Sequence, residues 1–185
     1  NTFKWEGKYE TNAPNEAITL SNSIINGEPN VLESYKPTLY SKNENKSEEY
    51  SLFLANADPE HQLDLINQMD KRAKLIGLDT MDFWINNSAE SVKRLFPNVD
   101  VIIINENEAK LITNENSLRN CIEKIQNLGA ERMVIKLGNY GLVYASNSTR
   151  FFLPAVLVEQ VKDPTGAGDS FAGGFMGYLS TVENL

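Results

Sequence analysis

The sequence is poor in cysteine, in long apolar runs and in positive charge, and each shortage excludes a class of protein. The single cysteine, Cys121, excludes an intrachain disulfide, and with a single histidine the chain has no Cys/His cluster of the zinc-binding kind. No apolar run reaches the roughly 20 residues that a membrane-spanning helix needs, and the first residues show no secretory signal pattern. The net charge of −8 at pH 7 argues against nucleic acid as a partner. We therefore expect a cytoplasmic globular protein with neither membrane nor nucleic-acid partners.

Two glycine-rich nucleotide motifs are absent as well. No Gly-x-x-x-x-Gly-Lys-Ser/Thr run occurs, so the chain is not a P-loop protein. Gly166 and Gly168 begin like the dinucleotide fingerprint Gly-x-Gly-x-x-Gly, but Phe171 stands where the third glycine would be. This argues against an NAD(P)-dependent dehydrogenase, which is the least favoured of three functional hypotheses.

The most informative stretch, residues 163–174, reads Asp-Pro-Thr-Gly-Ala-Gly-Asp-Ser-Phe-Ala-Gly-Gly. Gly166, Ala167 and Gly168 form a turn that opens a helix, so their backbone N–H groups can point at one spot, where the helix dipole adds positive charge. This pattern is typical of an anion hole. Asp169 falls in the first helical turn, where a carboxylate can take a proton from a hydroxyl that attacks a phosphoryl group. An ordinary helix start, in which an acidic residue complements the dipole, explains the same residues without a ligand.

The rest of the chain alternates between strands and helices. Apolar runs predict strands at 51–55, 73–78, 101–104 and 133–135, and a hairpin over 142–144 and 151–153. Helical spacing predicts helices from Pro59 with Asp58 as N-cap, from Ser88 to Phe96, near 105–112, near 117–128 and after Gly168. This order predicts an α/β fold with a mainly parallel sheet, whose ligands bind at the carboxyl ends of the strands. In the last helix, the small residues Ala172, Gly173 and Gly174 should let the helix lie close to the sheet.

The first 50 residues differ from this core. Apolar residues alternating with polar ones around Trp5 and Tyr9, and the stretches 17–20 and 24–25, predict two strands joined by a turn at 12–15. The following segment is rich in Asn, Glu, Lys, Ser and Pro and predicts a long polar connection. The predicted division is a β appendage at 1–27, a connection at 28–50 and an α/β core at 51–185.

Polar motifs follow three of the predicted strands. Asn105 and Glu108, directly after strand 101–104, have the spacing of a helix capping box. The run from Lys136 to Gly141 ends the next strand and fits a glycine-bearing hairpin. Asp79 ends the strand at 73–78, where an aspartate can serve simply to terminate the strand. These local explanations need no ligand.

Residues 163–174 closely resemble the C-terminal signature of the ribokinase-like (PfkB) carbohydrate kinase family. The resemblance covers residues 50–180, is strongest at 163–174 and is moderate at 99–112. It implies a ribokinase-like fold in which residues 1–27 form part of a small β lid. It also implies an ATP- and Mg²⁺-dependent kinase that phosphorylates a hydroxyl of a sugar or nucleoside. Which sugar or nucleoside stays open.

The resemblance also implies roles for single residues. Asp169 would be the catalytic base, and the amides of Gly166, Ala167 and Gly168 would form the anion hole. Glu108 would hold the hydrated Mg²⁺, because Mg²⁺ favours carboxylates and retains water. Many family members carry Thr or Ser where Lys136 stands, but a lysine there can pair with phosphate. The nucleotide-binding residues would be Lys136, Gly138, Gly141 and Asn105, and the substrate contacts would be Asp79 and Thr165.

The sequence also departs from the family pattern. Members begin with several strands and a Gly-Gly signature that binds substrate, whereas the only Gly-Gly pair here is Gly173-Gly174. We therefore expect the chain to start at the lid and to stop after the signature helix. The second hypothesis follows from this: a non-catalytic fragment or nucleotide-binding module of such a kinase. We also expect a homodimer, formed through the lid or an exposed sheet edge.

Overall fold

The structure is a computed structural model that describes residues 4–10, 13–22, 35–38, 50–69, 71–159 and 161–182. The chain divides into two units, one formed by residues 1–37 with 159–165 and the other by residues 38–158 with 166–185. In the described part of the chain, no helix has the length and apolar character needed to cross a membrane.

The smaller unit contains a two-stranded antiparallel sheet of β1 (Trp5–Glu10) and β2 (Ala13–Asn22). The two strands predicted in this region are therefore present, but β2 already begins within the predicted turn. The register shifts after Glu6 and again after Tyr9, as at a β-bulge. The predicted apolar stretch 24–25 lies outside the described residues. Ile18 and Leu20, two positions apart on β2, are both exposed.

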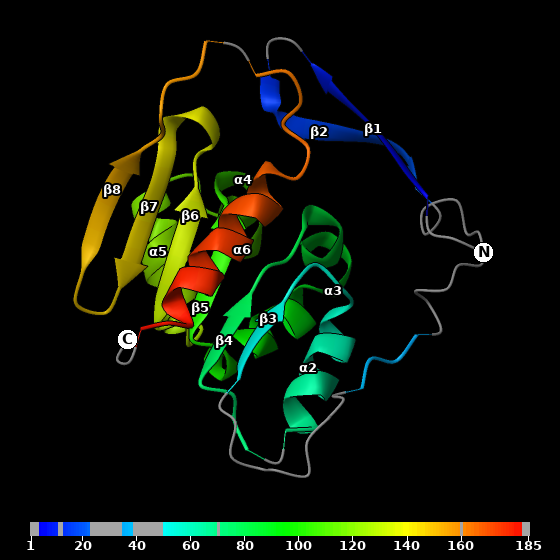
Figure 1. Cartoon of the computed structure of the whole chain (residues 1–185), viewed down its shortest axis with the longest axis vertical. Coiled ribbons are helices and arrows are strands. Elements are labelled where there is room, and N and C mark those ends of the chain that lie inside the picture. The colour runs from blue at the N-terminus through cyan, green and yellow to red at the C-terminus, as the bar shows by residue number, and fades with distance from the viewer. Residues whose placement is uncertain are drawn as a thin grey trace. The chain divides into compact units, whose positions relative to one another are not determined.

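The larger unit is built on a six-stranded sheet in the order β3-β4-β5-β6-β7-β8, which confirms the predicted α/β fold with a mainly parallel sheet (Figure 1). The first four strands pair in parallel and the last two pairings are antiparallel. The parallel strands are β3 (Ser51–Leu54), β4 (Leu75–Leu78), β5 (Val101–Asn105) and β6 (Arg132–Lys136). The predicted hairpin is β7 (Gly141–Ser146) with β8 (Arg150–Pro154).

Five α-helices of the described chain flank this sheet. On one face lie α2 (Pro59–Asn67), α3 (Asp82–Leu95), α4 (Glu106–Thr113) and α5 (Leu118–Asn127), and on the other lies α6 (Ala167–Leu179) (Figure 1). Two short 3₁₀ turns, Phe96–Asn98 and Gly138–Tyr140, follow α3 and β6. Asp58 caps α2 as predicted, because its Oδ1 accepts a hydrogen bond of 2.9 Å from the Glu60 N–H.

The parallel strands are apolar on both faces because both faces are covered by helices. Successive side chains of a strand point to opposite faces of the sheet, so the strands contribute side chains to two separate buried clusters. The larger cluster packs against α2 to α5 and includes Ile76, Leu78, Ile102, Ile104, Met133 and Ile135. The smaller cluster lies between the sheet and α6. Its strand residues are Leu75, Val101, Ile103 and Val134, and its helix residues are Ala172 and Met176. Cys121 is fully buried in the larger cluster, which agrees with a core role.

The helix predicted from Ser88 is present, because Ser88 has a non-helical backbone (φ −143°, ψ 39°) at a kink, and the predicted helix follows it. The helical segment before the kink, which begins at Asp82, was not predicted. The expectation that Gly173 and Gly174 bring the last helix close to the sheet is wrong, because nothing lies within 4 Å of a Cβ built on either. Close approach is made instead by Gly77 of β4, where an added Cβ would lie 2.5 Å from the Met176 sulfur. The close packing of α6 on the sheet therefore depends on the missing side chain of Gly77 in the sheet, and not on glycines in the helix.

Candidate active site

The N-terminus of α6 has the backbone geometry that the glycine turn predicts. Gly166 is the N-cap residue and has a left-handed conformation (φ 75°, ψ 1°), which glycine adopts without strain. The helical hydrogen-bond ladder begins with the Ser170 N–H donating to the Gly166 carbonyl at 2.8 Å. The amides of residues 166–169 precede this first bond and have no partner within the helix. These N–H groups lie at the positive end of the helix dipole, which is the backbone arrangement that the predicted anion hole requires.

The carboxyl ends of β4, β5 and β6 bring three of the predicted residues to one edge of the sheet. Asp79 follows β4, Asn105 ends β5 and Lys136 ends β6, and Asn105 and Lys136 are register partners. The Lys136 Nζ lies 3.7 Å from Asp79 Oδ2, so this ion pair spans the end of the intervening strand β5. The same Nζ lies 3.2 Å from the position of a Cβ on Gly168. The sheet edge and the first turn of α6 therefore belong to one site.

Asp79 is held at almost every polar atom. Its N–H donates to the Leu54 carbonyl at 2.9 Å, and its Oδ1 accepts from the Thr80 N–H at 2.8 Å. Burial raises the pKa of Asp79, and the positive charge of Lys136 is the largest effect that opposes this rise. The charge of Asp169 raises the same pKa, as expected for a second carboxylate close by. Asp169 itself is exposed in the first turn of α6, open to an incoming substrate.

Gln62 is a site-supporting residue that the sequence analysis missed. It is 2% exposed on α2, and its Nε2 donates to the carbonyls of Ala55 at 2.8 Å, Leu54 at 3.4 Å and Asp79 at 3.4 Å. One side chain thus ties together the carboxyl ends of β3 and β4. Its Oε1 is buried without a hydrogen-bond partner among the described residues. The only sequence signal is a polar residue on the helix face that also carries Leu63 and Ile66.

Asn105 and Glu108 form the capping box that their spacing predicts. The Glu108 N–H donates to Asn105 Oδ1 at 2.9 Å, and the Asn105 N–H donates to Glu108 Oε2 at 2.7 Å. Glu108 is also 6% exposed, and this burial raises the pKa of its carboxyl group to about 8, with a further rise caused by the charge of Asp79. A buried carboxyl group of this kind gains from a cation nearby.

The donor set also fits a hydrated magnesium ion. Over the described residues there is no group of three or more His, Cys, Asp or Glu side chains arranged to hold a metal. Mg²⁺ in nucleotide sites is commonly held by one or two carboxylates, retained water and substrate phosphates, so it needs no such group. Glu108 is a suitable single carboxylate because it lies near the same sheet edge as Asp79 and Lys136. The charges of both residues affect the pKa of Glu108, which shows that they are close to it.

The loop from Lys136 to Gly141 has a structural reason for its glycines. Leu137 N–H donates to the Gly141 carbonyl at 2.8 Å, which closes a tight turn. Gly138 and Gly141 have positive φ angles of 60° and 116°. A Cβ on Gly141 would lie only 2.0 Å from the Leu153 carbonyl oxygen, so no other residue fits there. The backbone alone therefore accounts for Gly141, whether or not a nucleotide binds beside it.

Thr165, the other predicted substrate contact, belongs to the smaller unit and is therefore described apart from this edge. Its N–H donates to Asp163 Oδ1 at 2.9 Å, and this hydrogen bond lowers the pKa of Asp163. Asp163 and Thr165 thus form a local turn through Pro164.

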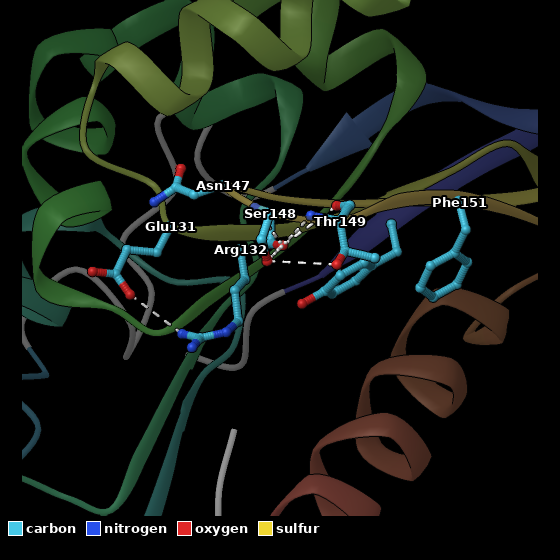
Figure 2. A pocket seen from close by; sticks show the side chains of 8 residues that line it. Glu131, Arg132, Asn147, Ser148, Thr149 and Phe151 are labelled. Carbon is cyan, nitrogen blue, oxygen red and sulfur yellow. Dashed lines mark hydrogen bonds and ion pairs between the residues drawn. The ribbon is translucent and has the colours of Figure 1, made fainter.

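A surface hollow lies at the other end of the sheet and contains none of the predicted site residues. Figure 2 shows its lining, which comes from the start of β6 and from the turn between β7 and β8. Ser146 Oγ accepts hydrogen bonds from the N–H groups of Ser148 and Thr149, and the rings of Tyr144 and Phe151 stack with centroids 5.0 Å apart. Arg132 begins β6 and Lys136 ends it, so roughly 13 Å of strand separates this hollow from the candidate site.

Comparison with known proteins identifies the family. The model of the pfkB family carbohydrate kinases matches residues 8–185, and the chain therefore belongs to that family. The chain is 35% identical over 126 residues to a cytidine kinase of Thermococcus kodakarensis, a match that covers 64% of this chain and 43% of the relative. It is 32% identical over 91 residues to a ribokinase of Staphylococcus aureus, covering 46% of this chain and 30% of the relative. The chain thus spans less than half the length of these curated relatives.

Solved structures support the fold. A ribokinase from Thermotoga maritima superposes with a TM-score of 0.68 at 22% identity, covering 99% of this chain and 58% of that protein. An aminoimidazole riboside kinase from Salmonella enterica, solved with aminoimidazole riboside and an ATP analogue, gives a TM-score of 0.65 at 20% identity, covering 74% of this chain and 50% of that protein. The ribokinase-like fold predicted from the signature is therefore confirmed.

Proposed function

We propose that this polypeptide is the part of an ATP-dependent kinase that transfers a phosphoryl group to a hydroxyl of a sugar or nucleoside. The observation that carries the proposal is the meeting of the Asp169 turn, the backbone anion site of α6 and the Lys136 ammonium at one sheet edge. Family membership supports the reaction class, and the named relatives act on sugars and a nucleoside. The particular acceptor is not decided by these residues.

Each group has a defined part in the reaction. Asp169 takes the proton of the acceptor hydroxyl as its oxygen forms a bond to the γ-phosphorus of ATP. The bond between the γ-phosphorus and the β–γ bridging oxygen breaks, and ADP leaves with that oxygen. The amides of Gly166, Ala167 and Gly168 face the equatorial oxygens of the transferring group, where negative charge must be stabilised. Exposure of Asp169 leaves it accessible to the acceptor.

The nucleotide side of the site is assigned to the sheet edge. Asn105, Lys136, Gly138 and Gly141 follow the carboxyl ends of β5 and β6, where ligands of parallel sheets bind. Glu108 would hold Mg²⁺ through retained water, and the ion would supply positive charge to the phosphates. Thr165 remains the proposed substrate contact. Asp79 was predicted to share that role, but both of its carboxylate oxygens are engaged by protein groups.

Asp169→Asn tests the proposal. Loss of the base should reduce acceptor-dependent ADP release about 10²- to 10⁴-fold and leave ATP binding nearly unchanged, because the amide keeps the size of the side chain. The matched control is Asp64→Asn, an exposed aspartate on α2, which should retain wild-type turnover. Wild-type turnover by the Asp169 variant would remove this residue from the role of base.

The second hypothesis, a non-catalytic nucleotide-binding module, is separated from the first by the same assay. A module would bind ATP, yet no sugar or nucleoside would accelerate ADP release. Asp169→Asn would then change nothing that the assay measures. A panel of sugars and nucleosides, each tested with the wild-type protein, decides between the two.

A homodimer and a cytoplasmic location remain predictions of this proposal. Exposed Ile18 and Leu20 lie two positions apart on β2, as residues on one face of a strand do, and they support association through the small sheet. Among the described strands, β3 and β8 form the two edges of the larger sheet and are the alternative surfaces. Light scattering on the wild-type protein and on Leu20→Ser tests the first route. A monomeric wild-type protein would contradict both.

A further inference from the structure

The positively charged ammonium of Lys136 lies beside the N-terminus of α6, which is the positive end of the helix dipole. The Lys136 Nζ lies 3.2 Å from the Cβ position on Gly168, in the first turn of α6. Helix N-termini attract anions and repel cations. The Lys136 side chain is only 20% exposed, so water screens this repulsion poorly. An ammonium placed here needs a carboxylate to hold it.

Asp79 is that carboxylate, and it is the immobile member of the pair. Its N–H donates to the Leu54 carbonyl, its carbonyl accepts from Gln62, and its Oδ1 accepts from the Thr80 N–H. This leaves Oδ2 for Lys136, whose ammonium sits on a flexible four-carbon stem. The carboxylate is fixed, and the ammonium can move.

The pair is also loose. The distance of 3.7 Å between Lys136 Nζ and Asp79 Oδ2 is well beyond the length of about 2.7–2.9 Å that a direct charge-assisted hydrogen bond takes. A loosely held ammonium can exchange one anionic partner for another at small cost. Phosphate oxygens at the first turn of α6 would be within easy reach of it.

We infer that Asp79 is a positioning residue: it holds the Lys136 ammonium beside the first turn of α6 until the nucleotide phosphates arrive and take the ammonium over. Asp79 acts through Lys136 and does not touch the substrate. This inference rests on the proposed function, in which phosphates bind at that turn. It replaces the predicted substrate contact of Asp79 by a role in preparing the phosphate site.

A double-mutant cycle tests this role. Binding of ATP with excess Mg²⁺, and of adenosine as the phosphate-free probe, is measured by calorimetry for the wild type, Asp79→Asn, Lys136→Met and the double variant. Lys136→Met should weaken ATP binding by about tenfold or more, because it removes a phosphate partner. Asp79→Asn should weaken ATP binding by about three- to tenfold, because the freed lysine must be ordered on binding. Adenosine binding should be equal in all four proteins.

The cycle separates the positioning of Lys136 by Asp79 from the direct effect of the Asp79 negative charge on ATP binding. In the Lys136→Met background, Asp79→Asn should leave ATP binding unchanged or tighten it, because only the removal of a negative charge remains. A weakening of equal size in both backgrounds would overturn the inference, and so would a wild-type protein that does not bind ATP. Asp79 as a merely structural residue would alter the free energy of unfolding without this coupling. The double variant leaves neither charge unpaired. If Asp79→Asn unfolds, Asp79→Glu, which keeps the negative charge but displaces it, takes its place in the cycle and should weaken ATP binding only when Lys136 is present.

Lys93→Met is the matched control. Lys93 is 29% exposed and pairs with Glu90 at 2.8 Å near the C-terminal end of α3, which returns toward the amino ends of the strands. Its removal should leave ATP binding unchanged. The inference and the proposed function can fail separately. If the protein shows the coupling but never phosphorylates a hydroxyl, the role of Asp79 stands and the proposed kinase function falls. If the protein is a fully active kinase without the coupling, the kinase function stands and the role of Asp79 falls.

Discussion

Replacing Glu108 by glutamine should change how stability depends on pH while the local structure stays in place. In the wild type, Glu108 Oε2 accepts a hydrogen bond of 2.7 Å from the Asn105 N–H. A glutamine amide oxygen can accept the same bond, because Glu and Gln both complete a capping box. The substitution therefore removes a buried titratable group and little else.

The magnitude follows from the shift of the Glu108 pKa. Burial raises this pKa from 4.5 to about 8. Between these values the unfolded chain loses the proton while the folded protein keeps it, so the folded state binds more protons and stability falls as pH rises. Each pH unit in this window costs up to about 1.4 kcal/mol. Between about pH 5.5 and about pH 7.5 the wild type should therefore lose about 2–3 kcal/mol through this residue.

Urea unfolding at the two pH values measures the effect. The free energy of unfolding of Glu108→Gln should exceed that of the wild type at the higher pH and approach it at the lower one. The control is Glu123→Gln, which removes an exposed carboxylate paired with Arg119 at 3.0 Å and should change stability by less than about 0.5 kcal/mol at either pH. If the wild type and Glu108→Gln lose stability in parallel, burial does not raise this pKa and the reasoning fails.

The same variant tests the metal role under the proposed function. Glu108→Gln should need more Mg²⁺ to reach half-maximal ADP release, because a neutral amide holds the hydrated ion less well. An unchanged Mg²⁺ requirement would leave Glu108 as a helix cap only.

Three further substitutions probe the backbone around the site. Gly141→Ala should destabilise the protein by more than about 3 kcal/mol, since its Cβ would lie 2.0 Å from the Leu153 carbonyl oxygen; near-wild-type denaturation would contradict this contact. Gly173→Ala should raise the free energy of unfolding by about 0.5–1 kcal/mol, because nothing lies within 4 Å and alanine favours the helix; a loss of stability would mean that this face is packed. Gln62→Leu should cost about 1–3 kcal/mol, because the Ala55 carbonyl loses its donor, and a neutral result in the same denaturation would show that these carbonyls need no partner.

Local chemistry made much of this structure predictable. The strands of the parallel sheet follow from continuous β-branched runs such as residues 101–104, and the capping box follows from the spacing of Asn105 and Glu108. The α6 turn follows from the requirement for a positive φ at Gly166. Each of these depends on residues close together in the chain.

Contacts between distant segments could not be predicted in this way. The Lys136–Asp79 pair needs the strand order that places β5 between β4 and β6. Gln62 was missed because its partners are backbone carbonyls, which leave no trace in the sequence. The helix start at Ser88 was predictable, but no local pattern indicated the helical segment that begins at Asp82, before the kink.

The two faces of the sheet differ in how firmly they hold their helices. Most of the core lies between the sheet and α2 to α5. On the other face of the described structure, α6 is a single helix that adds Ala172 and Met176 to the smaller buried cluster, and the partly buried Phe171, Phe175 and Leu179 pack against that cluster. Local opening follows the weakest packing, so α6 should detach in a sub-global fluctuation that leaves the sheet intact. The amides of the anion site would then exchange their hydrogens sooner than those of β5. Under the proposed function, heating should accordingly abolish phosphate binding before it melts the fold.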